Sequence, residues 1–220
     1  EALFKLAKKT IDSNNDWYSW KKIDETKLPF GIKLPEGNQY SKNVALKLEL
    51  NEKWLVATPA EKEILTTYYI SSWGGIHTNS PEKLNLYANT NPDKIIELGK
   101  KGIASWSKAL CVYEPEKYAI FDARVSISLN ALQIINKVKT PRLYPVLSSQ
   151  NNTIIKANKL VKEHAKKYKW DKHAYSEFYN NYLNLLSTIG KDKMSAVTPV
   201  YTIEMLLFAK AEELVQMAFP

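Results

Sequence analysis

The sequence predicts a mainly α-helical fold of about eight to ten helices. Only seven glycines occur among 220 residues, and because sandwiches and barrels need many tight turns, this scarcity favours helices joined by short loops. Helix starts are also recognisable, because at three places an N-capping Ser, Thr or Asn directly precedes a proline and an acidic residue follows. These starts are Thr58-Pro59-Ala60-Glu61, Ser80-Pro81-Glu82 and Asn91-Pro92-Asp93.

The first half of the chain begins with a predicted helix over residues 1–11, where apolar residues recur at helical spacing. Residues 43–50 alternate polar and apolar side chains, which predicts one short strand. The helix that starts at Thr58 is expected to end near Trp73, because the glycine pair that follows can supply a left-handed exit. Two short helices are expected after the other two capping signals.

The second half of the chain opens with the hairpin Gly99–Gly102, which leads into a predicted helix over 103–113. An apolar run, Tyr118–Phe121, then ends at Asp122, which is well placed to cap a helix over about 123–138. Farther along the chain, helices are expected at roughly 151–168, 172–188 and 201–218.

The domain organisation is expected to be simple. At 220 residues, the chain is long enough for one sizeable domain or for two small lobes that share a cleft. We therefore expect one domain over residues 1–220, either undivided or built from two helical lobes. The lobes would comprise about residues 1–57 with the C-terminal helices, and about residues 58–140.

The composition favours a polyanionic partner and a reducing, cytoplasmic environment. The formal net charge is +8, which suits nucleic acid, although many basic proteins bind none. One cysteine, Cys111, excludes an internal disulfide and multi-cysteine metal or iron–sulfur sites, and the three histidines are dispersed. No apolar stretch approaches the ~18–20 residues of a membrane span. We expect no metal, no cofactor and no membrane association.

Lys108 stands out in the helix predicted over 103–113, because it points almost opposite to the core-facing stripe. It is the only charged residue between Gly102 and Glu114, whereas an exposed helix face in this lysine-rich protein would carry several charges. One interpretation is an amine directed into a cleft, where desolvation lowers its pKa and leaves more neutral nucleophile near pH 7. The other is a snorkelling lysine whose stem covers apolar surface.

Asp122 lies fourteen residues after Lys108 and also has two interpretations. Between an apolar run and a helix, an aspartate is ordinarily an N-cap. The same position lies at the positive end of the helix dipole, which keeps the carboxylate ionised, and such a carboxylate beside a glycosidic bond can stabilise positive charge that develops on a sugar. Arg124, two residues on, either contacts a phosphate or pairs with Asp122 or Glu116.

The run from Gly102 to Leu132, GIASWSKALCVYEPEKYAIFDARVSISLNAL, resembles the helix–hairpin–helix superfamily of DNA glycosylases. It looks closest to the 8-oxoguanine glycosylase branch, including its divergent archaeal and bacterial members. The hairpin is Gly-Lys-Lys-Gly instead of the family's Leu-Pro-Gly-Val-Gly, and Lys108 lies farther from it and closer to the aspartate. The matching pieces are Gly99–Gly102, Ser107-Lys108, Asp122-Ala123-Arg124-Val125 and, near the C-terminus, Ile203–Phe208.

The resemblance implies a helix–hairpin–helix DNA glycosylase-like fold with a DNA-binding cleft, which acts as a monomer on DNA that carries a damaged or modified base. It implies that a nucleotide is flipped out of the duplex and that Lys108 attacks C1′ of its sugar to give a Schiff base. Asp122 would activate the lysine or stabilise charge on the sugar, and a β-elimination could then nick the strand. The phosphate contacts would come from Gly99, Lys100, Lys101, Gly102 and Arg124.

A flipped base also needs an aromatic platform. The candidates near the expected cleft are Tyr69, Trp73 and Trp106, and His77, just past the glycine pair, would line the same cleft. Each has an ordinary alternative. For the aromatic residues this is core packing, above all for Trp106, which lies on the core-facing stripe. For the histidine it is a structural or solvated loop position.

The sequence leaves several functions open. Oxidised guanine is the default base by resemblance, and a hypermodified base of the kind that some phages carry is the alternative, which would make the protein a defence enzyme. A non-catalytic DNA-binding module of the same fold predicts salt-dependent affinity without a covalent adduct. A partner-binding protein whose basic surface only keeps it soluble predicts no DNA affinity. A tyrosine recombinase is disfavoured, because that chemistry needs several arginines and only Arg124 and Arg142 are present.

Overall fold

The computed structural model describes residues 1–11, 17–20, 22–192, 194 and 196–220, and over these residues the chain is mainly helical. Strands in the described part are limited to a parallel pair, β1 (Arg142–Leu143) and β2 (Asp171–Lys172). The α-helices are α1 (Ala2–Ile11), α2 (Gln39–Val56), α3 (Pro59–Thr67), α4 (Pro81–Asn89), α5 (Pro92–Ile96), α6 (Ile103–Tyr113), α7 (Ala123–Ile135), α8 (Asn152–Lys167), α9 (Phe178–Asp192), α10 (Val200–Ala209) and α11 (Ala211–Ala218). Short 3-10 turns occupy Glu25–Lys27 and Pro29–Gly31, and Tyr68–Trp73 is a π-helical turn.

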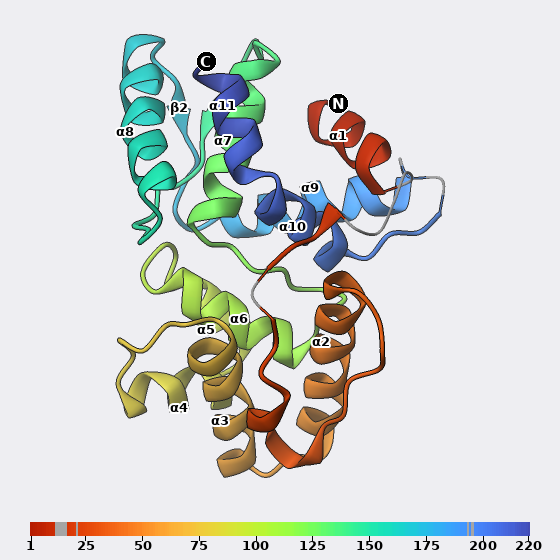
Figure 1. The fold of residues 1–220 in the computed structure, drawn as a ribbon. Coiled ribbons are helices and arrows are strands. Elements are labelled where there is room, and N and C mark those ends of the chain that lie inside the picture. Colours follow the sequence, from red (N-terminus) through yellow and green to blue (C-terminus); the bar gives the residue numbers. More distant parts are fainter. Residues whose placement is uncertain (12–16, 21, 193, 195) are drawn as a thin grey trace.

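The helices form two groups (Figure 1). In one group α6 packs against α2, α3 and α4, and in the other α7 packs against α8, α10 and α11. Helix α1 also belongs to the second group, since it contacts α7 and α10. This grouping does not coincide with the lobe boundaries expected at about 57 and 140, because α2 lies with α3–α6 and α7 lies with the C-terminal helices. Among the described residues, no helix has the length and apolar character needed to cross a membrane.

The strand predicted over residues 43–50 is wrong, because these residues lie inside α2. Asn38 caps this helix, with its side chain accepting a hydrogen bond from the Ser41 amide at 2.9 Å. The alternation over eight residues was misleading because the buried positions across the whole helix have helical spacing. Those buried positions are Asn43, Leu46, Lys47, Leu50 and Trp54.

The predicted helix starts are confirmed at Thr58, Ser80 and Asn91, whose side chains cap α3, α4 and α5. At Thr58 the full capping box forms, since the Thr58 amide also donates to the Glu61 carboxylate at 2.8 Å. The helix continues to Trp73 as predicted, but its last six residues form the π-helical turn. The left-handed residue that ends it is Gly75, with φ of +71°.

Three predicted boundaries in the second half differ from the structure. Helix α7 ends at Ile135 instead of about 138. Helix α9 begins at Phe178 instead of 172, because residues 171–172 pair with β1 as a short strand. The last predicted helix, 201–218, is two helices that meet at Lys210, so that α11 packs against α7.

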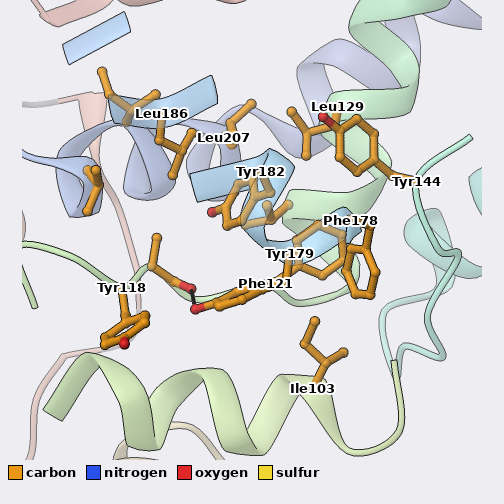
Figure 2. Packing of buried hydrophobic residues seen from close by; sticks show 14 of the residues in the cluster. Ile103, Tyr118, Phe121, Leu129, Tyr144, Phe178, Tyr179, Tyr182, Leu186 and Leu207 are labelled. Atoms are coloured by element: carbon orange, nitrogen blue, oxygen red, sulfur yellow. Dashed lines mark hydrogen bonds between the residues drawn. The ribbon is translucent and has the colours of Figure 1, made fainter. Parts of the chain in front are cut away.

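The connection Tyr118–Phe121 joins α6 to α7 and lies in the core, with each side chain 2% exposed or less. It has no helical or strand pairing of its own. Buried peptide groups without partners are costly, so its N–H and C=O groups need hydrogen bonds from elsewhere. Figure 2 shows the aromatic side chains of this region, with Tyr179, Tyr182 and Phe178 around Phe121.

Two tyrosines of α9 donate hydrogen bonds to carbonyl groups of this connection. The Tyr179 hydroxyl donates to the Ala119 carbonyl oxygen at 2.8 Å, and the Tyr182 hydroxyl donates to the Ile120 carbonyl oxygen at 2.8 Å. Both tyrosines are 1% exposed or less, and burial raises their pKa well above the ordinary value of 10, so the hydroxyls stay protonated donors. Helix α9 therefore stabilises the connection by hydrogen bonding as well as by packing.

Side chains of α6 form further hydrogen bonds with peptide groups of the connection. The Phe121 amide donates to the Ser107 hydroxyl oxygen at 3.1 Å, and that hydroxyl donates to the Ile103 carbonyl oxygen at 2.6 Å. The Cys111 thiol donates to the Tyr118 carbonyl oxygen at 3.3 Å. The connection is thus fixed to α6 at both ends, which fixes where α7 begins.

Removing either tyrosine hydroxyl should destabilise the protein without changing its shape. We expect Tyr179→Phe and Tyr182→Phe each to lower the free energy of unfolding by about 1–3 kcal/mol, because each leaves a buried carbonyl without its donor. Urea unfolding followed by circular dichroism measures this. Tyr168→Phe is the matched control, since Tyr168 is 57% exposed; an equal loss in all three variants would contradict the role given to the buried hydroxyls.

Candidate active site

Lys108 lies in the middle of α6 and its side chain is buried, with 5% exposed. Its Nζ donates to the Ala104 carbonyl oxygen at 2.8 Å. The stem of the lysine passes against the backbone of Gly74, where a Cβ would lie 2.8 Å from Lys108 Cε. The amine is therefore enclosed by the protein and does not extend along the surface to water, as a snorkelling lysine would.

Burial lowers the pKa of the Lys108 amine from its ordinary value of 10.5. The charges of Asp122 and Glu204 act in the opposite direction and raise that pKa, and Lys47 adds to the lowering. Desolvation is the largest of these effects, so a larger fraction of the amine is neutral at a given pH than for a lysine in water. A lowered pKa of this kind is one way in which a lysine becomes a better nucleophile.

Asp122 has the capping role that its sequence position suggested. Its Oδ1 accepts hydrogen bonds from the amides of Arg124 and Val125 at 2.9 and 3.0 Å, so it is the N-cap of α7. It also acts electrostatically on the buried groups, because its charge raises the pKa of both Lys108 and Glu204. The structure therefore brings Lys108 and Asp122 to the same place, where α6 meets the start of α7.

Glu204 and Lys47 belong to the same cluster and were not identified from the sequence. Glu204 lies in α10 and is 3% exposed; burial raises the pKa of its carboxyl to about 7, although Lys47 lowers it. Lys47 lies in α2 and is 1% exposed. Glu204 carried the signal that singled out Lys108, whereas Lys47 did not, because its helix contains several other charged residues. Glu204 is the one charged residue in the run Val200–Ala209, and Lys47 shares the apolar face of a helix.

An aromatic stack lies beside this cluster, in the π-helical turn. Tyr69 and Trp73 are stacked with ring centroids 4.3 Å apart and an interplanar angle of 13°. Lys47 Nζ lies 5.4 Å from the centroid of the Trp73 ring, and Trp73 Nε1 donates to Asn43 Oδ1 at 2.9 Å. Two of the aromatic residues predicted for a base pocket therefore border the buried charges.

The structure places the other two pocket candidates elsewhere. Trp106 is fully buried in the core and packs edge-to-face against Tyr179, with centroids 4.7 Å apart. His77 is exposed in the loop between the π-helical turn and α4. Core packing, the alternative noted for Trp106, describes its position.

The hairpin predicted at Gly99–Gly102 is a turn between α5 and α6. Gly99 and Gly102 have φ of +56° and +73°, and a Cβ at Gly102 would lie 2.5 Å from the Tyr87 hydroxyl, so both positions require glycine. Lys100 and Lys101 are exposed on this turn. Helix α6 begins at it without a side-chain cap, and the amides of Ile103 and Ser105 donate to the carbonyl oxygens of Lys100 and Gly102 at 3.5 and 2.9 Å.

Arg124 pairs with neither of the partners expected from the sequence, Asp122 or Glu116. Its Nη2 lies 2.6 Å from Glu212 Oε1, which ties α7 to α11. The guanidinium also lies over the rings of Phe208 and Trp20, at 5.2 and 5.9 Å from their centroids. The protein itself therefore occupies the guanidinium that was predicted to bind phosphate.

The buried cluster is closed in this structure. Two surface hollows, of about 480 and 510 Å³, are lined by Lys22–Thr26 and by residues from Lys27 to Ser72, and neither is lined by Lys108, Asp122 or Glu204. In the described ranges, no group of His, Cys, Asp and Glu is arranged to hold a metal ion. Comparison of the chain with protein-family models, with curated proteins and with solved structures returned no match.

Replacing Glu204 by glutamine should flatten the pH dependence of stability. Below its ordinary pKa of 4.5 the carboxyl is protonated in both states. As the pH rises from 4.5 through about 7, the unfolded chain loses the proton first, so the folded state loses stability. We expect the wild type to lose about 3 kcal/mol more than Glu204→Gln across this window. Urea unfolding at a series of pH values measures the difference; parallel curves would show that Glu204 is not buried as an acid.

Proposed function

We propose that the protein is a DNA glycosylase of the helix–hairpin–helix type that removes a damaged or modified base, with Lys108 as its nucleophile and Asp122 as its catalytic carboxylate. The observation that carries this proposal is the buried Lys108 amine, whose pKa is lowered by desolvation and which lies within electrostatic range of Asp122. A structural lysine would gain nothing from such a position, because burial of a charge is costly.

The chemistry follows from the neutral amine. The Nζ lone pair forms a bond to C1′ of the target nucleotide while the bond between C1′ and the base breaks, and the leaving base takes that electron pair and a proton. The base takes one of the two protons of the attached nitrogen, and the other passes to O4′ as the C1′–O4′ bond breaks, which opens the sugar ring and leaves an imine between Lys108 and C1′. Loss of a proton from C2′ of this imine would then expel the 3′ phosphate with the electrons of its C3′–O bond, which gives the enzyme an abasic-site lyase activity.

Asp122 supports the step by charge. Positive charge develops on the sugar as the base leaves, and an ionised carboxylate held in a fixed position stabilises it without reorganisation. The position is fixed because Oδ1 is held by two amides at the start of α7. The buried connection before it fixes that helix start against α6.

DNA would be held at the turn between α5 and α6. The turn presents the side chains of Lys100 and Lys101 to solvent, where their ammonium groups can contact phosphates. The net charge of +8 favours the same partner. We infer that the protein acts as a monomer and needs no cofactor for this reaction.

The closed cluster implies a movement before the reaction. Lys108 is 5% exposed, so a flipped nucleotide reaches it only if the two groups of helices separate locally. The Tyr69–Trp73 stack borders the lysine and is the platform nearest to the expected base. The substrate base is then either an oxidised guanine, as the resemblance implies, or a hypermodified base.

Trapping with borohydride tests the nucleophile. Duplexes that carry oxidised, alkylated, deaminated or hypermodified bases are incubated with the protein, and borohydride reduces any imine to a stable adduct visible on a denaturing gel. We expect an adduct with the wild type and with Lys139→Gln, a control on an exposed lysine, and none with Lys108→Gln. An adduct that persists in Lys108→Gln would assign the chemistry to another amine. Absence of both adduct and base release from every duplex would identify a non-catalytic DNA-binding module.

Asp122→Asn separates the charge of this residue from its capping role. Asparagine also caps helices well, so folding should be preserved. Loss of the carboxylate should slow base release by about 10²–10³-fold, measured in single-turnover reactions. In the same assay the wild-type rate should increase with pH and level off below the ordinary lysine pKa of 10.5, because the lowered pKa of Lys108 sets the fraction of neutral amine. An unchanged rate in Asp122→Asn would remove the carboxylate from the mechanism.

Replacement of Lys100 and Lys101, in the turn between α5 and α6, tests the proposed DNA contact. If Lys100 and Lys101 each neutralise one phosphate, the double variant to alanine should reduce the slope of log affinity against log salt by about 2. Fluorescence anisotropy with a labelled duplex measures the slope. Lys156→Ala with Lys159→Ala, on exposed α8 positions, is the control pair, and an equal effect of that pair would place the DNA elsewhere.

A further inference from the structure

Three polar atoms around Lys108 are buried and have no hydrogen-bond partner within the part of the chain that the structure describes. They are Lys47 Nζ, Glu204 Oε2 and the Tyr69 hydroxyl. The three residues come from α2, from α10 and from the π-helical turn, so they belong to both groups of helices. Each is 3% exposed or less. Polar atoms of this kind are nearly always paired in folded proteins, so three unpaired ones in one place point to a missing partner.

Two of these atoms, Lys47 Nζ and Glu204 Oε2, belong to groups of opposite charge that attract each other but form no ion pair in the described part of the chain. Lys47 lowers the pKa of Glu204 by its charge, yet no ion pair within 4.0 Å forms between them among the described residues. Burial of both groups is costly, and direct pairing would offset much of that cost. Both groups are therefore left without a direct polar partner among the described residues.

We propose that Lys47 and Glu204 are a specificity-determining pair that recognises the lactam edge of a nucleobase, an N–H next to a C=O. This inference rests on the proposed function, since it names the substrate class of the same site. The ammonium of Lys47 only donates, so it contacts the carbonyl oxygen. The carboxylate of Glu204 accepts the adjacent N–H.

The pair distinguishes two classes of base. Guanine-type bases, hypoxanthine, uracil and thymine have an N–H next to a carbonyl group, including when they are oxidised or extended elsewhere on the ring. Adenine and cytosine have the opposite pattern, a ring nitrogen that accepts and an amino group that donates. Their amino group would face the ammonium of Lys47, donor against donor, and leave buried groups unpaired.

The position of Lys47 is compatible with this role. Its amine lies 5.4 Å from the centroid of the Trp73 ring. This is a cation–π contact, which stabilises the ammonium without a negatively charged partner. The four-carbon stem is flexible, so the ammonium can leave the ring for the carbonyl oxygen of a base that lies against the aromatic stack. Burial raises the pKa of the Glu204 carboxyl to about 7, so it is only partly ionised near pH 7, and an N–H and the Lys47 ammonium that face it would favour the ionised form.

Two matched pairs of free bases test the proposal directly. Each base is methylated at the nitrogen that carries the sugar in a nucleotide, because free cytosine otherwise offers N1–H next to C2=O. The N-methylated forms of uracil against cytosine and of hypoxanthine against adenine then share a ring system and differ at this edge. We expect uracil and hypoxanthine to bind the wild-type protein at least about tenfold more tightly than cytosine and adenine, measured by ligand-observed NMR titration. Lys47→Met and Glu204→Gln keep the side-chain volume and should each reduce the preference to less than about threefold.

Two residues outside the buried cluster provide the controls. Lys53→Met lies on the same helix as Lys47, and Glu163→Gln lies on α8; both should retain the full preference. Equal binding of all four bases, binding of none, or a preference that survives in both Lys47→Met and Glu204→Gln would overturn the proposal.

A second measurement separates this proposal from the proposed function. Base release from duplexes with hypoxanthine, uracil or 8-oxoguanine, which have the lactam edge, and from duplexes with an alkylated adenine or an oxidised cytosine, which lack it, is compared between the wild type and Lys47→Met. If Lys108-dependent release continues at the wild-type ratio of bases in Lys47→Met, the glycosylase assignment stands and the specificity pair fails. If no duplex loses a base but uracil and hypoxanthine still bind preferentially, the pair stands as a base-binding site and the glycosylase assignment fails.

Discussion

The arrangement of the site depends on how one buried stretch of extended chain satisfies its peptide groups. Tyr118–Phe121 crosses from one group of helices to the other without a strand partner, so its hydrogen bonds come from side chains of α6 and α9. These bonds are made in a water-free interior, where an unmade bond is expensive. They leave little freedom in where the chain arrives at Asp122, and the distance of that carboxylate from Lys108 is therefore a property of the core.

Local signals were sufficient for this central part of the chain. The limits of α6 and the cap at Asp122 were predicted correctly, because both follow from neighbours in sequence: a glycine turn before one helix, and an aspartate between an apolar run and the next. The burial of Lys108 was also foreseeable, since a helix with a single charged residue among apolar ones is covered by protein on most of its sides. The same local reasoning found the caps of α3, α4 and α5.

The parts that the sequence did not reveal are non-local. Lys47 lay in a segment interpreted as a strand, and alternation over eight residues cannot distinguish two periods when the helix extends well beyond them. Arg124 found its partner in Glu212, eighty-eight residues away, where no spacing rule applies. Glu204 was not predicted as a site residue, although its sequence offered a signal. Its sequence context was as informative as that of Lys108, but an acid in a helix near the C-terminus becomes part of a site only when another helix is known to face it.

The close packing of Gly74 against Lys108 constrains how this sequence can change during evolution. A side chain there would occupy the space that the stem of Lys108 fills, within 3.0 Å of two of its carbons and of the Ile70 carbonyl oxygen. The two positions are therefore linked by sterics: a lineage that retains the amine must retain the smallest residue at position 74. The contact with the Ile70 carbonyl oxygen, at 2.6 Å, remains in a lineage that loses the amine. A larger residue at position 74 would therefore require the backbone of the π-helical turn to move as well as the lysine stem.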